Sequence, residues 1–253
     1  MRQALILAGG LGTRLRPTTE TIPKPLMPVG EHFFLHYLLR MLVENGVQDV
    51  LLLIGHLSEK VIEAIGDGAR CGCRVAYSIE EELLGTGGAI KNAAAKVHDE
   101  FFVLNGDTYL PIDYRAVEAH WEARRNELDG LLVVYDNVQP VAPDNVRLGD
   151  DELVAEYRKY VDAPPNGAVQ NARDASGGVD AGVQIFKKTI LGMIPEGRAA
   201  SIEVEVFPEL VARRRLGTYV TSTRYYDIGT PERLATFERY IARHGLDAQE
   251  ASS

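Results

Sequence analysis

The chain has 253 residues, of which 45% are hydrophobic and 25% charged, and its formal net charge is −9 at neutral pH. This composition fits a globular protein with one sizeable α/β domain or two small ones, and it excludes the collagen, coiled-coil and disordered classes. The acidic balance argues against a nucleic-acid partner, because such proteins carry clustered Lys and Arg in excess.

The first predicted element is a buried strand over residues 2–8. Its apolar run is far too short for a signal peptide, and no later run approaches the length of a membrane span. We therefore expect a cytoplasmic protein without a membrane partner.

A glycine-rich loop with two cations follows this strand. Gly9, Gly10 and Gly12 let backbone N–H groups converge on phosphate oxygens, while Arg14 and Lys24 offset the charge that gathers there. The glycine spacing differs from that of Walker-type NTPases and of dinucleotide folds. An ordinary strand-to-helix turn is the alternative for the glycines alone, but the added cations favour a triphosphate site.

Helices and strands then alternate through the first half of the chain. Hydrophobic periodicity predicts helices over residues 32–45, 58–65, 87–95 and 114–126, and strands over residues 49–54, 74–79, 101–104 and 131–135. Alternation of this kind predicts an α/β fold in three layers, with helices on both faces of a mostly parallel sheet.

Shorter elements are predicted after residue 139. Strands over residues 151–157 and 179–186 flank a segment, residues 161–178, that we interpret as a lid over the substrate or a mobile loop. A helix over residues 204–215, a strand over residues 218–222 and a helix over residues 231–244 complete the chain. Since no linker separates them, we expect a single domain over residues 1–253 with halves of about 1–138 and 139–253.

Two aspartates are placed to hold a metal ion. Asp107 follows the strand at residues 101–104, at the carboxyl end where ligands bind in open α/β sheets. Asp227 lies just before the last helix, and two such carboxylates match what Mg²⁺ usually takes from a protein. The alternative for both is a turn or helix-start aspartate.

Residues 7–17 together with Pro23, Lys24 and Pro25 resemble the signature of sugar-1-phosphate nucleotidyltransferases. That family joins a nucleoside triphosphate to a sugar 1-phosphate and releases pyrophosphate. The resemblance implies a Rossmann-like, GT-A-like three-layer sandwich with Mg²⁺ (or Mn²⁺) as cofactor. It makes residues 1–138 the nucleotide-binding half and residues 139–253 the sugar-binding half, and it leaves a homo-oligomer open.

The resemblance also implies a role for individual residues. Arg14 and Lys24 are the expected catalytic cations: Arg14 orients the β- and γ-phosphates, and Lys24 bridges the phosphates of both substrates. Asp107 and Asp227 are the expected metal ligands. Nucleotide contacts are expected from Leu7, Ala8, Gly9, Gly10, Gly12, Thr13, Glu80, Gly85, Thr86 and Gly106.

Three segments resemble the sugar-phosphate contacts of the family. Lys159 matches a phosphate-binding lysine, although Arg158 stands where an acidic residue is expected. Asp180 and Gly182 lie in a strand segment where the family has Asn-Ala-Gly or Thr-Ala-Gly, so Asp180 replaces an amide or a hydroxyl. Glu203 resembles a glutamate that holds a sugar hydroxyl, and an acidic residue near a helix start is its plain alternative.

Glu80 determines the expected base. Residues 78–82 resemble the guanylyltransferase version of this region, whereas relatives acting on thymidine or uridine nucleotides place a glutamine near Glu80. A carboxylate accepts from both N1–H and N2–H₂ of guanine, but it would face the carbonyl oxygens of uracil or thymine. A solvated acidic run is the competing interpretation of residues 80–82.

The subgroup that this chain resembles most is the D-glycero-D-manno-heptose 1-phosphate guanylyltransferases. Mannose-1-phosphate and glucose-1-phosphate enzymes, with thymidylyl, uridylyl, cytidylyl or adenylyl transfer, are the alternatives. A non-catalytic nucleotide-sugar-binding subunit is the alternative of another class, since fold alone does not determine function. It is disfavoured because the chain keeps both cations and both aspartates.

Overall fold

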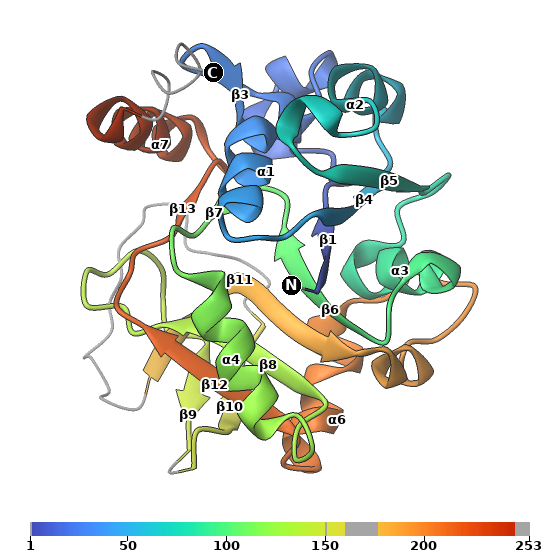
Figure 1. The fold of residues 1–253 in the computed structure, drawn as a ribbon, viewed down its shortest axis with the longest axis vertical. Coiled ribbons are helices and arrows are strands. Elements are labelled where there is room, and N and C mark those ends of the chain that lie inside the picture. The colour runs from blue at the N-terminus through green and yellow to red at the C-terminus, as the bar shows by residue number, and fades with distance from the viewer. Residues whose placement is uncertain (1, 150, 160–176, 246–253) are drawn as a thin grey trace.

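A computed structural model describes residues 2–149, 151–159 and 177–245 (Figure 1). Within these residues a nine-stranded sheet forms the centre of the molecule. Its strands are β1 (Gln3–Leu7), β4 (Asp49–Ile54), β5 (Arg74–Ile79), β6 (Glu100–Asn105), β8 (Gly130–Tyr135), β9 (Val146–Leu148), β10 (Val154–Tyr157), β11 (Gly177–Lys187) and β12 (Leu216–Thr221).

The sheet is parallel on one side and mixed on the other. β1 pairs in parallel with β4 and β6, and β5 extends this ladder beyond β4. β11 runs antiparallel between β6 and β8, and β12 is parallel to β8. β9 pairs with the start of β11 and with β10. The carboxyl ends of β1, β4, β5 and β6 therefore lie along one edge, as the predicted α/β architecture requires.

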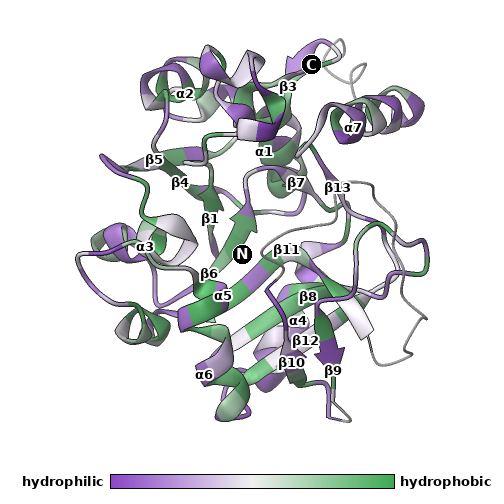
Figure 2. Cartoon of the chain, turned by 180° about the vertical axis from the view of Figure 1, so that it is seen from behind, coloured by the Kyte–Doolittle hydropathy of each residue, from purple (hydrophilic) through white to green (hydrophobic). Residues whose placement is uncertain are grey.

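Helices cover both faces of the sheet (Figures 1 and 2). Alternate residues of a strand point to opposite faces, and accordingly Ala4 and Ile6 pack into one fully buried cluster while Leu5 packs into the other. In Figure 2 the strands are mostly hydrophobic, as expected for strands buried on both faces. The helices are α1 (Phe34–Glu44), α2 (Ser58–Ile65), α3 (Gly85–Asn92), α4 (Tyr114–Arg124), α5 (Ile202–Glu205), α6 (Phe207–Ala212) and α7 (Pro231–His244).

Short elements fill the connections between these strands and helices. Two ladders of two-residue strands, β2 (Pro28–Val29) with β3 (His32–Phe33) and β7 (Thr108–Tyr109) with β13 (Tyr226–Asp227), lie outside the large sheet. Short 3-10 helices cover Thr13–Leu15, Thr18–Glu20, Lys24–Leu26, Ala69–Cys71, Ala94–Lys96 and Lys188–Met193. In the described ranges no helix is both long and apolar enough to cross a bilayer.

Most predicted elements match the structure, and the differences have local causes. The helix predicted over residues 204–215 is wrong as one element, because it is divided into α5 and α6; Pro208 lacks a backbone N–H and therefore occupies the first turn of α6. The strand predicted over residues 151–157 is confirmed only from Val154. α1 begins at Phe34, and α3 begins two residues earlier than predicted. Of the predicted lid, residues 161–176 lie outside the described ranges and the last two belong to β11.

Candidate active site

A cavity of about 610 Å³ lies at the carboxyl ends of β1 and β6. This volume is within the range of small-molecule sites, and the position is the one where open α/β sheets bind ligands. Its walls come from segments distant in the chain: Leu7, Ala8, Gly9, Gly10, Leu11, Gly12, Thr13, Arg14, Lys24, Pro25, Glu80, Leu83, Gly85, Thr86, Ala89, Asn105, Gly106, Asp107, Glu203 and Gly229.

Close backbone packing forms the floor of the cavity. Gly106 N–H donates to Leu7 O at 2.9 Å, and a Cβ on Gly106 would lie 2.5 Å from that same oxygen. Gly12 has a left-handed backbone (φ 60°) and begins the first 3-10 helix. A side chain at Gly12 would also meet Thr19 Cγ2 at 2.9 Å. These two positions require glycine for conformation and for space.

The two cations of the loop differ in their contacts. Lys24 is mostly buried, and its Nζ forms an ion pair with Asp107 Oδ2. The Arg14 guanidinium lies beside Gly229, with Nη2 3.5 Å from the place of a Cβ there. No residue in the described part of the chain forms a hydrogen bond or ion pair with it. Arg14 therefore presents an uncompensated positive charge to the cavity, where an anionic ligand can meet it.

Asp107, in the turn just before β7, lies close to Asp227 of β13. β7 pairs antiparallel with β13, so that Asp227 is the Cα partner of Thr108, and Ile228 N–H donates to Asp107 O at 3.0 Å. Burial acts to raise the pKa of Asp107, but Lys24 and more weakly Arg14, with hydrogen bonds from Lys24 and Thr108, hold the pKa below its ordinary value. The Asp107 carboxylate is therefore ionised at neutral pH.

The Asp227 carboxylate is held at both oxygens. Oδ1 accepts from Gly229 N–H at 2.9 Å, and Oδ2 accepts from Arg233 Nη1 at 2.8 Å. Arg233 reaches back from the first turn of α7, whose N-cap is Thr230. In the described ranges no group of three or more His, Cys, Asp or Glu could hold a metal ion. Asp107 is paired with Lys24, and Asp227 is paired with Arg233.

Glu80 lies in the wall of the cavity, beside Gly9 of the glycine loop. Its Oε2 accepts from Leu84 N–H at 2.9 Å, and its Oε1 lies 2.6 Å from the place of a Cβ on Gly9. Burial raises the pKa of Glu80, and the hydrogen bond from Leu84 partly offsets this. The carboxylate is thus fixed at the edge of the cavity and is more than a solvated surface charge.

A chain of polar contacts joins Glu203 to Lys159. Thr86 Oγ1 donates to Glu203 Oε2 at 3.0 Å, and Ser201 Oγ donates to that same oxygen. Lys159 Nζ donates to Ser201 Oγ at 2.6 Å and lies 3.5 Å from Glu203 Oε2. These contacts join Lys159 to Glu203, which lines the cavity.

The Asp180 carboxylate accepts hydrogen bonds from residues of its own strand, β11. The register of β11 against β8 shifts after Asp180, and Asp180 Oδ1 accepts from Gly182 N–H at 2.9 Å and Gln184 Nε2 at 3.1 Å. Gly182 has φ 73°, and a Cβ there would lie 2.8 Å from Asn105 Nδ2. Burial raises the pKa of Asp180 to about 6. These bonds shape the bulge beside the cavity.

The structure brings together most of the predicted site. The predicted residues that do not line the cavity are Lys159, Asp180, Gly182 and Asp227. Lys159 contacts the lining Glu203, Asp227 contacts the lining Gly229, Gly182 packs against the lining Asn105, and Asp180 is joined to the cavity through Gly182. Two polar residues were not predicted: Asn105, which lines the cavity, and Arg233. The sequence signal for Arg233 was its place one helical turn after the Thr230 cap.

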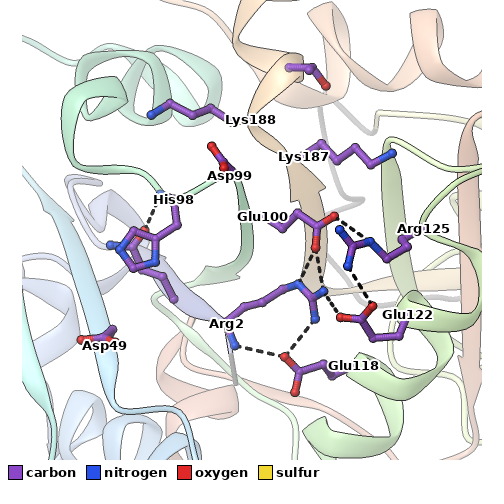
Figure 3. Close-up of a pocket in the computed structure, with 12 residues that line it drawn as sticks. Arg2, Asp49, His98, Asp99, Glu100, Glu118, Glu122, Arg125, Lys187 and Lys188 are labelled. Atoms are coloured by element: carbon purple, nitrogen blue, oxygen red, sulfur yellow. Dashed lines mark hydrogen bonds and ion pairs between the residues drawn. The ribbon is translucent and has the colours of Figure 1, made fainter.

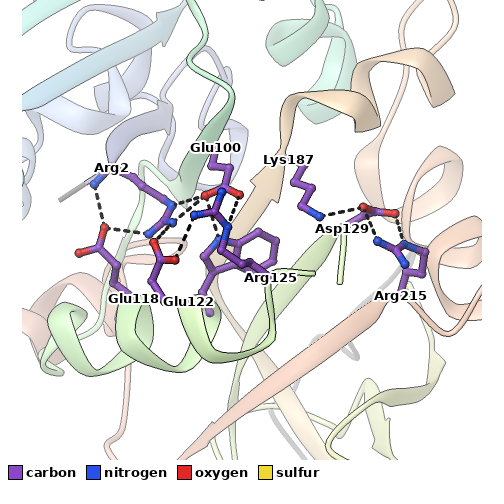
Figure 4. A network of polar contacts seen from close by, with 9 residues as sticks. Arg2, Glu100, Glu118, Glu122, Arg125, Asp129, Lys187 and Arg215 are labelled. Carbon is purple, nitrogen blue, oxygen red and sulfur yellow. Dashed lines mark hydrogen bonds and ion pairs between the residues drawn. The ribbon is translucent and has the colours of Figure 1, made fainter. Parts of the chain in front are cut away.

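A second cavity, of about 620 Å³, lies at the opposite, amino-terminal ends of β1, β4 and β6 (Figure 3). Three of its four Lys and Arg side chains pair with carboxylates, and the fourth, Lys188, donates to Val97 O at 2.7 Å. Arg2 contacts Glu100 at 2.6 Å and Glu118 at 2.9 Å, and also Glu122, which Arg125 contacts at 3.2 Å (Figure 4). Because both of its arginines are already paired with glutamates, this cavity offers no arginine without an ion pair to an anionic ligand.

Comparisons with known proteins cover most of this chain. The family model described as nucleotidyl transferase matches residues 3–244. D-glycero-alpha-D-manno-heptose 1-phosphate guanylyltransferase of Campylobacter jejuni is 44% identical over 230 residues, covering 91% of this chain and 96% of that protein. Mannose-1-phosphate guanylyltransferase of Mycobacterium tuberculosis is 33% identical over 233 residues, covering 90% of this chain. The chain spans only 61% of the length of that second relative.

Solved structures show the same fold. HddC from Yersinia pseudotuberculosis superimposes with a TM-score of 0.79 at 28% identity, covering 95% of this chain and 100% of that chain. A second structure of HddC, complexed with GMP-PN, gives a TM-score of 0.76.

Proposed function

This chain belongs to the nucleotidyl transferase family, and we propose that it transfers the GMP moiety of GTP to the phosphate of a sugar 1-phosphate. An oxygen of the sugar phosphate forms a bond to the α-phosphorus, the bond from this phosphorus to the α,β-bridging oxygen breaks, and pyrophosphate leaves. The observation that carries the proposal is the cavity at the carboxyl ends of β1 and β6. The lining of this cavity includes the glycine-rich backbone, the Lys24–Asp107 ion pair and Arg14, which has no ion pair in the described ranges.

The cations supply most of the catalysis in this proposal. The attacking group is already charged and pyrophosphate is an adequate leaving group, so positioning and charge stabilisation dominate. Arg14 orients the β- and γ-phosphates and stabilises the charge that develops on them. Lys24 lies between this loop and Asp107, and it bridges the phosphates of both substrates. Lys159 and Glu203 hold the phosphate and a hydroxyl of the sugar.

Asp107 and Asp227 fit a divalent cation. Both are oxygen donors, Asp107 is kept ionised, and the pairing of β7 with β13 brings the turn that holds Asp107 beside Asp227. Mg²⁺ is usually bound by one or two carboxylates together with substrate phosphates, which agrees with a site of two aspartates and no third protein ligand in the described ranges. When bound, Mg²⁺ (or Mn²⁺) neutralises charge on the phosphates.

Glu80 favours guanine as the base. Its carboxylate is held at the rim of the cavity by Leu84 N–H, and it accepts from the N1–H and N2–H₂ groups of guanine. The guanylyltransferase names of the relatives and the GMP-PN in the HddC complex support this choice.

We infer a heptose 1-phosphate of the D-glycero-D-manno type as the sugar. The support is the match to the Campylobacter jejuni protein, which covers almost the full length of both chains, whereas the mycobacterial mannose enzyme is matched over 61% of its length. Mannose 1-phosphate is the second candidate.

The test is pyrophosphate release from GTP, ATP, CTP, UTP and dTTP, each with a panel of sugar 1-phosphates. We expect turnover with GTP and a heptose or mannose 1-phosphate. Turnover of another triphosphate with none of GTP would overturn the guanine assignment. Calorimetric binding of nucleotide without pyrophosphate in any combination would support a non-catalytic binding subunit instead.

A further inference from the structure

A small cavity of about 50 Å³ lies beside Asp227 and is lined by residues of β13, α7 and the segments next to them. It shares no lining residue with the larger cavity at the carboxyl ends of β1 and β6. Because one water needs about 10–15 Å³ on this measure, the space holds a few waters or one tetrahedral anion, but no nucleotide. It is lined by Val141, Arg224, Tyr225, Tyr226, Asp227, Arg233 and Thr236.

Two guanidinium groups line this cavity, and one of them lacks a partner. Arg224 Nε is fully buried without a hydrogen bond, and no other residue in the described ranges forms a hydrogen bond or ion pair with this side chain. Its guanidinium carbon lies 5.4 Å from the centroid of the Tyr226 ring, so aromatic packing holds it in place. A buried donor left unpaired is costly and rare, and it indicates that something outside the described chain satisfies it.

Charge favours an anion over water alone in this position. Arg233 is the second cation, and its charge is shared with Asp227 Oδ2 at 2.8 Å. The cavity is therefore lined by two positive charges and one negative charge. Arginine presents five N–H donors in a planar fork that matches phosphate oxygens, and Arg233 can keep its bond to Asp227 while other N–H groups face the cavity.

We propose that Arg224 and Arg233 form an oxyanion subsite beside Asp227 that takes a single phosphate group. The group is either free orthophosphate or the phosphate of a sugar monoester whose sugar remains outside the cavity. The subsite does not depend on the proposed transfer reaction, because its recognition of phosphate requires only the two arginines.

The experiment is calorimetric titration of the full chain with inorganic phosphate and, separately, with mannose 1-phosphate. Arg224→Met removes the charge but keeps the length of the side chain, and we expect it to weaken phosphate binding about tenfold or more. Arg224→Lys restores the charge and should recover part of the affinity. Arg14→Ala is the matched control, because it removes a cation of the larger cavity and should leave the Arg224-dependent binding in place.

The two ligands distinguish the source of the phosphate. Loss of inorganic phosphate binding in Arg224→Met assigns the subsite to free orthophosphate, and loss of mannose 1-phosphate binding alone assigns it to a monoester. Wild-type protein that binds neither ligand at millimolar concentration would overturn the proposal. So would binding that Arg14→Ala abolishes and Arg224→Met leaves unchanged. Thermal unfolding of Arg224→Met and Arg224→Lys shows whether each variant is folded. If Arg224→Met does not fold, the phosphate affinity of Arg224→Lys tests the proposal instead.

Discussion

The same sheet carries a charged cavity at each end, and the two differ in how their charges are compensated. At the amino ends of the strands Arg2 contacts three glutamates, and Lys187 and Arg215 contact Asp129 (Figure 4). At the carboxyl ends Arg14 has no ion pair within the described residues. The cavities have nearly equal volumes, so size does not identify the site. The pairing of the arginines distinguishes them, because Arg2 would have to give up its carboxylates before it met a phosphate, whereas Arg14 would not.

The largest expected effect comes from Arg14→Ala. Removing a cation that acts on developing phosphate charge should lower kcat/KM about 10²- to 10³-fold. The melting temperature should stay unchanged, because Arg14 makes no internal ion pair. Arg16→Ala is the matched control, since Arg16 is exposed in the same loop and does not line the cavity. Pyrophosphate release and thermal unfolding check both variants, and a kcat/KM for Arg14→Ala within a factor of two of wild type would contradict the comparison.

Arg2→Met should show the opposite pattern. It removes the guanidinium from Glu100 and Glu118, which keep only Arg125, Trp121 Nε1 and the N–H of residue 2 as partners. The loss of these charge-assisted hydrogen bonds should lower the free energy of unfolding by about 2 to 3 kcal/mol. kcat/KM should not change. Urea denaturation measures the effect, and Arg74→Met, which breaks an exposed pair with Asp49, should cost less than about 1 kcal/mol. Equal costs for the two variants would show that the Arg2 network contributes no more than a surface pair.

Glu80→Gln tests a carboxylate of the catalytic cavity. A glutamine can no longer accept from two donors of guanine, so the ratio of kcat/KM for GTP over UTP should fall about tenfold to a hundredfold. Glu82→Gln is the control, because Glu82 is exposed and does not line the cavity. The ratios come from initial rates with each triphosphate. An unchanged ratio in Glu80→Gln would show that Glu80 does not select the base, as the interpretation of residues 80–82 as a solvated acidic run expects.

Lowering the pH should change the stability contributions of two aspartates in opposite directions: Asp129, at the amino ends of the strands, and Asp180, beside the carboxyl-end cavity. The pKa of Asp129 is lowered by its hydrogen bonds to Arg215, so its contribution to stability is present above the unfolded pKa and is lost as the pH falls through the folded pKa. Burial raises the pKa of Asp180 to about 6, so this group favours folding at low pH and its contribution is lost as the pH rises from about 4 to 6.

Asp180→Asn isolates this second effect. Relative to wild type, the variant should gain about 1 to 3 kcal/mol of unfolding free energy between pH 4 and pH 7, because it removes a buried carboxyl that must ionise. Denaturation at several pH values measures the difference. Parallel curves for variant and wild type would show that the Asp180 pKa is not raised.

Local sequence patterns predicted the helices and strands well where one face of an element is apolar. α2, α7, β4 and β5 have the predicted bounds, since each combines clear periodicity with a turn or a cap. The pairing of β7 with β13 could not be predicted, because each strand has two residues and the partners are more than a hundred residues apart. That pairing brings Asp227 to Asp107.

The contacts of the candidate site likewise divide into those that could be identified from the sequence and those that could not. The glycine loop and its cations lie within one short segment and could be identified from the sequence. Arg233 was missed although the start of α7 was predicted, because its contact with Asp227 depends on the direction that its side chain takes in the folded structure. The use of Asp180 inside the β11 bulge also follows from tertiary structure, because its partners Gln184 and Tyr157 come from two strands.

The central claim is that the carboxyl-end cavity binds the triphosphate and the amino-end cavity does not. Calorimetric titration of Mg²⁺ and GTP into wild type, Arg14→Ala and Arg2→Met tests it directly. We expect Arg14→Ala to bind GTP at least about tenfold more weakly than wild type and Arg2→Met to bind it with unchanged affinity. Weakened binding in Arg2→Met with normal binding in Arg14→Ala would contradict it.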